Sequence, residues 1–195
     1  MNLIYLHGFQ SSPKSVKGQQ LQRYCAQYYP EICVHAPDLN LPPFQVMDVL
    51  LGYVQSLDRV AVLGSSLGGF YATCLALQCH CPAVLINPAV RPWQLFADLF
   101  GIDRLPYVVT PEWSLRQQDL TELQHLHQPM ASNLSKILVL LQQGDETLDY
   151  RDAQRYYSQG NHPAMIMTET AGNHRMDNFV DKIPMLLSFL SQNID

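Results

Sequence analysis

The residues best suited to chemistry form the motif Gly-Ser-Ser-Leu-Gly at residues 64–68. This G-x-S-x-G lies directly after a short apolar run and directly before a helical pattern, which is the context of a nucleophile elbow. Such a turn exposes its serine, and the N-terminus of the following helix favours an oxyanion. Ser66 is therefore the candidate nucleophile. Ser65 occupies the variable position before it and is expected to pack.

A serine hydroxyl is a weak nucleophile and needs a base. In proteins with such a nucleophile elbow, the order along the chain is serine, acid, histidine. Of the seven histidines, only His162 and His174 follow a plausible acid. His162 precedes the apolar run at 164–168, which would place it at the amino end of a strand. His174 follows that run and would reach the edge where Ser66 is exposed. His174 is the predicted base.

The acid should lie on a short loop after the apolar run at 137–141. Asp145 does so, and Gly144 before it permits a turn. Glu146 and Asp149 remain competitors. Glu146 is adjacent and should point elsewhere, while Asp149 is expected to cap the next helix. Asp145 is predicted to orient His174.

An oxyanion hole needs two N–H donors. One is the backbone N–H after the nucleophile, here Leu67, and the other comes from a loop after an earlier strand. The Phe9 backbone N–H is the predicted second donor, with Gln10 as the alternative. His7 is expected to be a buried histidine that bonds its own loop.

The elements that must position these residues are short apolar runs separated by helical patterns. Near-continuous apolarity favours strands covered on both faces, hence a parallel sheet between helices. Helical patterns start at Ser12 with Pro13 and at Pro43, follow Ser66, and recur at 149–158 and 179–190. In the last helix, Pro184 should cause a kink or mark the true start. The six predicted strands are 3–6, 32–35, 60–63, 83–86, 137–141 and 164–168.

Residues 87–135 interrupt this alternation. They show no strand signal but contain several prolines and aromatic residues, and so long a connection in a compact domain is usually functional. We expect a single α/β-hydrolase domain over residues 1–195, with 87–135 as a helical cap or lid over an acyl pocket. Trp93 and Phe96 are the candidates to line that pocket.

Composition limits the partners. The net charge of −5 comes from scattered acidic residues, and no stretch gathers Lys and Arg, so nucleic acid is not an expected partner. No apolar run approaches the roughly 18 residues of a membrane span, and residues 1–6 lack a basic leader region. A cytoplasmic protein is expected. Five cysteines without a C-x-x-C pair predict free, mostly buried thiols and no metal site. No cofactor is expected, and the oligomeric state stays open.

Several segments together resemble one family. The sequence is similar, over nearly its whole length, to the small bacterial YqiA-type esterases of the α/β-hydrolase superfamily. The segments that carry this resemblance are 6–9 with 11–13, 64–69, 87–92, 144–146 with 148–151, and 172–174. The resemblance implies hydrolysis of carboxylic esters or acyl-CoA thioesters by Ser66, Asp145 and His174.

Two features depart from the wider pattern. Many members of the superfamily have two more N-terminal strands, for which this chain has no room. Arg175 and Met176 follow His174 where an aromatic residue is expected soon after the histidine. The shape of the pocket rim is therefore left open.

The sequence predicts a serine hydrolase that acts on a small-molecule acyl ester or acyl thioester through an acyl-enzyme on Ser66. The alternatives are a catalytically silent binding protein with the same fold, and an acyltransferase that uses the same acyl-enzyme with an acceptor other than water. Labelling with a fluorophosphonate would separate the silent protein from both enzymes.

Overall fold

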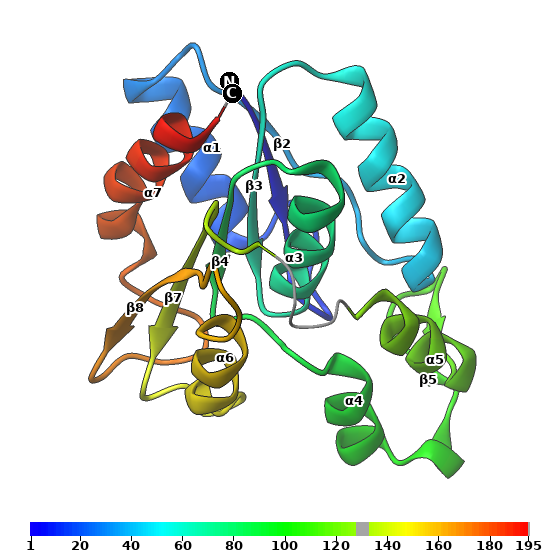
Figure 1. The fold of residues 1–195 in the computed structure, drawn as a ribbon. Coiled ribbons are helices and arrows are strands. Elements are labelled where there is room, and N and C mark those ends of the chain that lie inside the picture. Colours follow the sequence, from blue (N-terminus) through cyan, green and yellow to red (C-terminus); the bar gives the residue numbers. More distant parts are fainter. Residues whose placement is uncertain (128–132, 195) are drawn as a thin grey trace.

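A six-stranded parallel sheet forms the centre of the molecule (Figure 1). The computed structural model describes residues 1–127 and 133–194. The strand order is β2-β1-β3-β4-β7-β8, and every neighbouring pair is parallel. The predicted six-stranded parallel sheet is therefore confirmed. The strands are β1 (Asn2–Leu6), β2 (Cys33–His35), β3 (Val60–Ser65), β4 (Ala83–Ile86), β7 (Ile137–Gln142) and β8 (Met165–Glu169).

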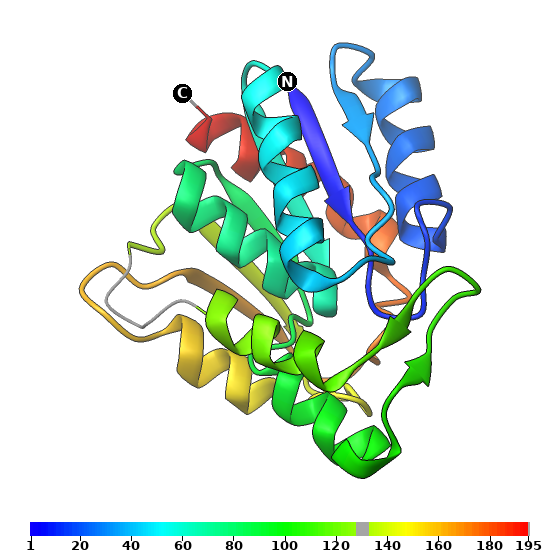
Figure 2. The same ribbon diagram turned by 90° about the vertical axis from the view of Figure 1, so that its right-hand side faces the viewer.

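Helices cover both faces of this sheet (Figures 1 and 2). Side chains alternate between the faces along a strand. In β1, Leu3 and Tyr5 belong to one core cluster, whereas Ile4 and Leu6 belong to the other. Both sets are buried, which explains why the strands read as continuous apolar runs. The first cluster is closed by α1 (Val16–Tyr28) and α7 (Phe179–Asn193), and the second by α2 (Pro43–Ser56), α3 (Leu67–Cys79) and α6 (Tyr150–Tyr157).

The start of α1 differs from the sequence prediction, whereas α7 begins at Phe179 as predicted. Helix α1 is capped by Ser15, whose hydroxyl accepts the N–H of Gly18 at 3.3 Å, and not by Ser12. Helix α7 runs through Pro184 from Phe179, so Pro184 does not mark its start. A proline inside a helix removes one backbone hydrogen bond. The packing of α7 in the core, where Ile183 and Leu186 are fully buried, offsets that loss.

Strand β8 is less covered than predicted. It lies at the edge of the sheet, and its Met165 and Met167 side chains are 57% and 44% exposed. The expectation of burial on both faces is wrong for this strand, because the helices pack on the other strands of the sheet and leave β8 largely uncovered.

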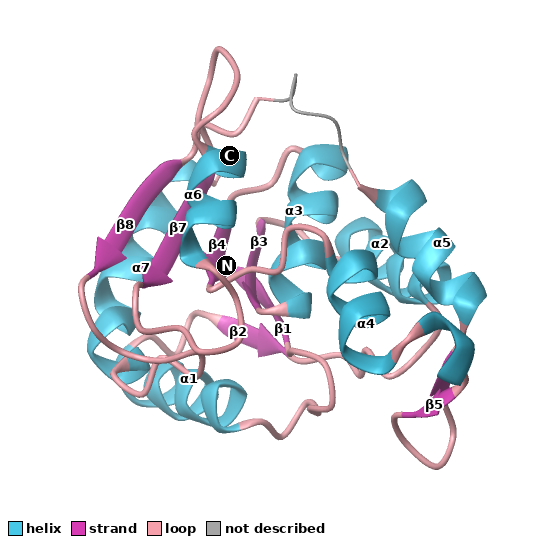
Figure 3. Cartoon of the chain, turned by 90° about the horizontal axis from the view of Figure 1, so that it is seen from below, coloured by secondary structure: helices cyan, strands magenta, loops and turns pink. Residues whose placement is uncertain are grey.

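The 87–135 segment forms α4 (Pro92–Phe100), a 3-10 helix (Ile102–Arg104), the short strands β5 (Tyr107–Val108) and β6 (Ser114–Leu115), and α5 (Gln117–Leu126). Strands β5 and β6 pair antiparallel, which corrects the expectation that this segment contains no strand. Residues 128–132 of the expected cap lie outside the described residues. Figure 1 shows α4, α5 and β5 toward the end of the molecule to which the strand arrows point, and Figure 3 shows α5 between α4 and α2.

The five cysteines are free thiols, and Cys25, Cys74 and Cys81 are buried. Burial raises the pKa of Cys25 to about 11 and the pKa of Cys74 and Cys81 to about 12, so these thiols stay protonated at neutral pH. No helix among the described residues is long and apolar enough to cross a membrane.

Candidate active site

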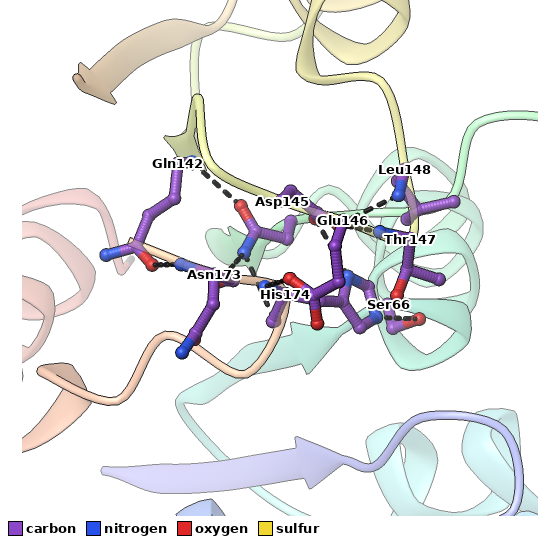
Figure 4. A network of polar contacts seen from close by, with 9 residues as sticks. Ser66, Gln142, Asp145, Glu146, Thr147, Leu148, Asn173 and His174 are labelled. Atoms are coloured by element: carbon purple, nitrogen blue, oxygen red, sulfur yellow. Dashed lines mark hydrogen bonds and ion pairs between the residues drawn. The ribbon is translucent and has the colours of Figure 1, made fainter. Parts of the chain in front are cut away.

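The sequence-predicted residues Ser66, Asp145 and His174 lie at one edge of the sheet. Ser66 directly follows β3, Asp145 lies on the loop after β7, and His174 lies on the loop after β8. Because these strands are parallel, their carboxyl ends meet at the same edge, where α/β proteins commonly bind ligands. Figure 4 shows the three side chains converging from these three loops.

The turn at Ser66 is a sharp strand-to-helix turn. Ser66 has φ 56° and ψ −119°, a strained conformation for a residue with a side chain. Its N–H donates to the Ile86 carbonyl at 3.0 Å. A Cβ on Gly64 would lie 2.2 Å from the Gly68 oxygen, and one on Gly68 would lie 2.1 Å from the Leu6 oxygen. Both outer glycines of the G-x-S-x-G motif are therefore required by close backbone approach.

The three side chains form a continuous hydrogen-bonded series. Nε2 of His174 lies 3.1 Å from Oγ of Ser66, and Nδ1 of His174 lies 2.8 Å from Oδ2 of Asp145. The other oxygen of Asp145, Oδ1, accepts the backbone N–H groups of Thr147 and Leu148, both at 2.8 Å. The Asp145 side chain is only 2% exposed and that of His174 is 19% exposed. A carboxylate held in this way can fix one tautomer of an imidazole, which can then accept a proton from a hydroxyl.

The two competing carboxylates have other partners. Glu146 bonds the backbone of His174, because its Oε2 accepts the His174 N–H at 2.9 Å. This hydrogen bond lowers the pKa of Glu146. Asp149 caps α6 as expected, since its Oδ1 accepts the N–H of Arg151 at 3.0 Å. Of the three carboxylates, Asp145 is the one that bonds the His174 ring.

The residues predicted to form an oxyanion hole lie at the start of α3 and on the loop after β1. Leu67 is the first residue of α3, and the first N–H groups of a helix have no acceptor within it. The loop after β1 comes close to Ser66, because a Cβ on Gly8 would lie 3.3 Å from the Ser66 Cβ. Phe9 is the next residue of this loop. Leu67 directly follows Ser66 and Phe9 follows Gly8, and their role as oxyanion donors stays a prediction.

His7 fixes the same loop. It is 1% exposed, its Nε2 accepts the N–H of Leu39 at 3.1 Å, and its Nδ1 lies 2.9 Å from the Gly8 oxygen. Burial lowers the pKa of His7, which keeps the ring neutral at neutral pH. This is the placement expected for a buried loop histidine.

The 87–135 segment packs on the Phe9 loop. The Phe9 ring lies 4.5 Å from the Phe96 ring and 5.8 Å from the Phe100 ring, centroid to centroid. Next to it, Nε2 of Gln10 donates to the hydroxyl of Tyr107 at 2.7 Å. Helix α4 and the β5–β6 hairpin therefore hold the loop that approaches Ser66.

A cavity of about 190 Å³ lies between the loops that follow β4 and β7. Its walls bond directly to the site, because the Ala89 N–H donates to the Ser66 carbonyl at 3.1 Å and Leu148 bonds Asp145. The lining mixes apolar and charged side chains. It consists of Pro88, Ala89, Val90, Arg91, Gln94, Leu95, Asp98, Thr147, Leu148, Asp149, Asp152 and Ala153.

Trp93 and Phe96 lie on the other face of α4 from the residues that line this cavity. Phe96 is 3% exposed and packs on Phe9. The Trp93 ring lies edge-on to the rings of Phe70 and His127, at 6.5 and 5.0 Å. Helical spacing indicated an apolar face correctly, but it did not indicate what that face contacts.

Sequence reasoning missed two buried amides, Asn87 and Gln142. Both are 2% exposed, and both contact the backbone of the loop that carries His174. The available signal was a polar residue at the end of each of two apolar strands. Among the described residues, no group of three or more His, Cys, Asp or Glu side chains is placed to hold a metal ion.

Known structures with the same fold are hydrolases and esterases of low sequence identity. Mouse alpha/beta hydrolase domain-containing protein 10 matches with a TM-score of 0.78 at 14% identity, covering 98% of this chain and 90% of that protein. Est1E from Butyrivibrio proteoclasticus, solved with ferulic acid bound, matches with a TM-score of 0.74 at 14% identity, covering 98% and 88%. A lipase-esterase related protein from Clostridium acetobutylicum matches with a TM-score of 0.62 at 12% identity, covering 96% and 93%. These matches show the α/β-hydrolase fold.

The family comparison covers almost the whole sequence. It confirms the resemblance to the YqiA-type proteins that the motifs indicated. Because residues 2–191 match the family described as "Uncharacterised protein family (UPF0227)", the chain belongs to that family.

Proposed function

We propose that this protein is a serine hydrolase that cleaves carboxylic esters or acyl thioesters, acyl-CoA included, through an acyl-enzyme on Ser66. The observation that carries the proposal is the series from Ser66 Oγ to His174 Nε2 and from His174 Nδ1 to Asp145. A serine, a histidine and a buried carboxylate in this geometry perform acyl transfer on several unrelated folds.

In the proposed reaction, Ser66 Oγ attacks the acyl carbonyl carbon while its proton passes to Nε2 of His174. Asp145 stabilises the resulting imidazolium. The tetrahedral intermediate then collapses, and His174 gives the proton to the departing alcohol or thiol. Water attacks the acyl-enzyme in the same way, giving its proton to His174, and the acid leaves as Ser66 is restored.

The backbone N–H groups of Leu67 and Phe9 are proposed to bind the oxyanion. Removing one such donor costs about 10²- to 10³-fold in kcat in a serine protease, so the position of the Phe9 loop matters for rate. Its packing on Phe96 and the hydrogen bond from Gln10 to Tyr107 support this assignment, because they hold the loop against Ser66.

The cavity beside Ala89 and Leu148 is proposed to receive the acyl or the leaving group. Its bonds to Ser66 and Asp145 support this placement. The esterase matches support an ester as substrate. In the same proposal residues 1–195 form one domain in which the 87–135 segment is the cap. A contact between the Trp93 side chain and the acyl chain is also proposed.

A substrate panel tests the proposal. Nitrophenyl esters and acyl-CoAs of graded acyl length are assayed with the unmodified protein and with Ser66→Ala, His174→Ala and Ser65→Ala. We expect hydrolysis to fall on the order of 10⁴-fold or more in the first two variants. Ser65→Ala is the matched control and should keep most activity.

Each alternative gives a different result. A folded protein that turns over no ester or thioester would support the silent binding protein. Acyl transfer to added alcohols in preference to water would support the acyltransferase. Activity that survives Ser66→Ala would contradict the proposed acyl-enzyme.

A further inference from the structure

His174 lies on a loop whose backbone is held by side chains. The N–H of Asn173 donates to Oε1 of Gln142 at 2.8 Å, and the N–H of His174 donates to Oε2 of Glu146 at 2.9 Å. The carbonyl oxygens of Asn173 and His174 both accept from Nδ2 of Asn87, at 3.1 and 3.2 Å. Every backbone polar group of these two residues is thus bonded to a side chain, and these side chains come from the ends of β4 and β7 and from the loop after β7.

Asn87 makes two of these four bonds and is itself fixed on all sides. It is 2% exposed, its Oδ1 accepts the N–H of Gln142 at 3.0 Å, and its own N–H donates to the Leu140 carbonyl at 2.9 Å. Its φ of 40° lies in the left-handed region, which asparagine tolerates better than most residues. Only a short amide offers one acceptor and two donors from this position.

Gln142 is held as firmly. Its Nε2 donates to Oε2 of Glu169 at 2.7 Å and to Oδ1 of Asn178 at 2.8 Å. Its Oε1 is left to accept the N–H of Asn173, as Figure 4 shows. Burying two amides costs free energy unless their hydrogen bonds are made, and here the bonds are made to the histidine loop.

We propose that Asn87 is a positioning residue for His174: its amide ties both carbonyl groups of the Asn173–His174 unit to the end of β4, beside Ser66. Ser66 and Asn87 share this edge, since the Ser66 N–H bonds Ile86, the residue before Asn87. The distance between His174 Nε2 and Ser66 Oγ is thereby set by a side chain from the neighbouring strand. This inference rests on the proposed function, in which His174 is the base.

The test compares Asn87→Gly and Asn87→Asp. Asn87→Gly removes the amide, and glycine accepts the positive φ without strain. Asn87→Asp keeps an acceptor for the Gln142 N–H but replaces the donors by a carboxylate facing two carbonyl oxygens. A misplacement of about 1 Å can cost about 10²-fold in rate. We expect kcat to fall about 10²-fold in both variants, with KM changed by less than about threefold.

Asn2→Asp is the matched control. The Asn2 amide also donates to a distant backbone carbonyl, that of Asp58 at 2.7 Å, and its Oδ1 bonds His35 at 2.9 Å. It lies at the opposite end of the sheet, so this variant should keep the kcat of the unmodified protein. Circular dichroism and thermal unfolding give the folded fraction by which each kcat is divided.

A second readout does not need activity. The Nδ1 proton of His174, bonded to Asp145, is followed by NMR in the unmodified protein and in Asn87→Gly. The inference predicts that its resonance shifts or broadens in Asn87→Gly and stays unchanged in Asn2→Asp. An unchanged resonance together with kcat within threefold in folded Asn87→Gly would overturn it. If the unmodified protein hydrolyses nothing, the proposed function fails, and the resonance alone decides whether Asn87 positions the ring.

Discussion

Three carboxylates follow β7 within a few residues, and each has a different partner. Asp145 bonds the His174 ring, Glu146 bonds the His174 backbone, and Asp149 caps α6. Residue type and spacing alone do not separate them, because all are acidic and lie on the same loop. Their hydrogen-bond partners separate them: one carboxylate holds the imidazole, one holds the backbone of the histidine loop, and one caps a helix.

This division predicts the order of three variants. Asp145→Asn should lower kcat on the order of 10⁴-fold, as the equivalent change does in a serine protease, because an amide can hold the imidazole in the wrong tautomer. Glu146→Gln keeps an acceptor for the His174 N–H and should cost much less. Asp149→Asn changes a carboxylate that caps α6 and lines the cavity, and it should also cost less than Asp145→Asn. Steady-state kinetics on one nitrophenyl ester measures all three variants. A severe Asp149→Asn and a mild Asp145→Asn would contradict the assignment.

Ser66 and His174 could be predicted because their signals are local or follow from chain order. The serine motif is five residues long, and the histidine is selected by following the last strand. Asn87 and Gln142 could not be predicted in this way. Their bonds to the histidine loop span 86 and 31 positions, and a polar residue at the end of an apolar strand does not indicate which distant backbone it bonds.

Among the elements, helix α4 makes different contacts with its two faces. Phe96 and Phe100 pack toward Phe9, whereas Gln94 and Leu95 line the cavity beside Ser66. The apolar periodicity of α4 was visible in the sequence, but the cavity lies on its less apolar face. The β5–β6 hairpin was missed for a related reason, since strands of two residues are too short to show a period.

The cavity predicts an effect at Leu95. Leu95→Trp should fill part of the space of about 190 Å³ and raise KM or lower kcat/KM for bulky substrates more than for the smallest ester. Leu99→Trp is the matched control, because Leu99 is on the same helix and 61% exposed. The measurement is kcat/KM over a series of esters for both variants. Equal profiles for Leu95→Trp and Leu99→Trp would show that this cavity does not receive the substrate.

At the scale of the whole molecule, the sheet order and the loops bring distant segments to one edge. Glu169, at the end of β8, connects this strand with β7 and α7. It forms an ion pair with Lys182 of α7 and accepts hydrogen bonds from Gln142 of β7 and from Asn178. The alternation of strands and helices could be predicted from the sequence, but these connections depend on the packing of α7 against the sheet.

The bonds to Glu169 predict how stability changes in acid. The hydrogen bond to Lys182, with those to Gln142 and Asn178, lowers the pKa of Glu169 from 4.5 to about 2. A carboxyl group with a lowered pKa stabilises the folded state above its unfolded pKa, and the stability is lost as pH falls toward its folded pKa. Thermal unfolding should therefore show a loss between about pH 4.5 and pH 2 that is smaller in Glu169→Gln.

Glu31→Gln is the control for this pH series, since Glu31 is exposed and far from Glu169 in the sequence. It should follow the unmodified protein. The same acid slope in Glu169→Gln and in the unmodified protein would show that Glu169 does not contribute to stability in this window.

The most direct test of Ser66 as the nucleophile is covalent labelling. The folded protein is treated with a fluorophosphonate and digested, and the modified residue is identified by mass spectrometry. We expect one label per chain, on Ser66, with no labelling of Ser66→Ala, full labelling of Ser65→Ala and much slower labelling of His174→Ala, because the base is gone. A label on any other residue, or a folded unmodified protein that takes none, would contradict the assignment of Ser66 as the nucleophile.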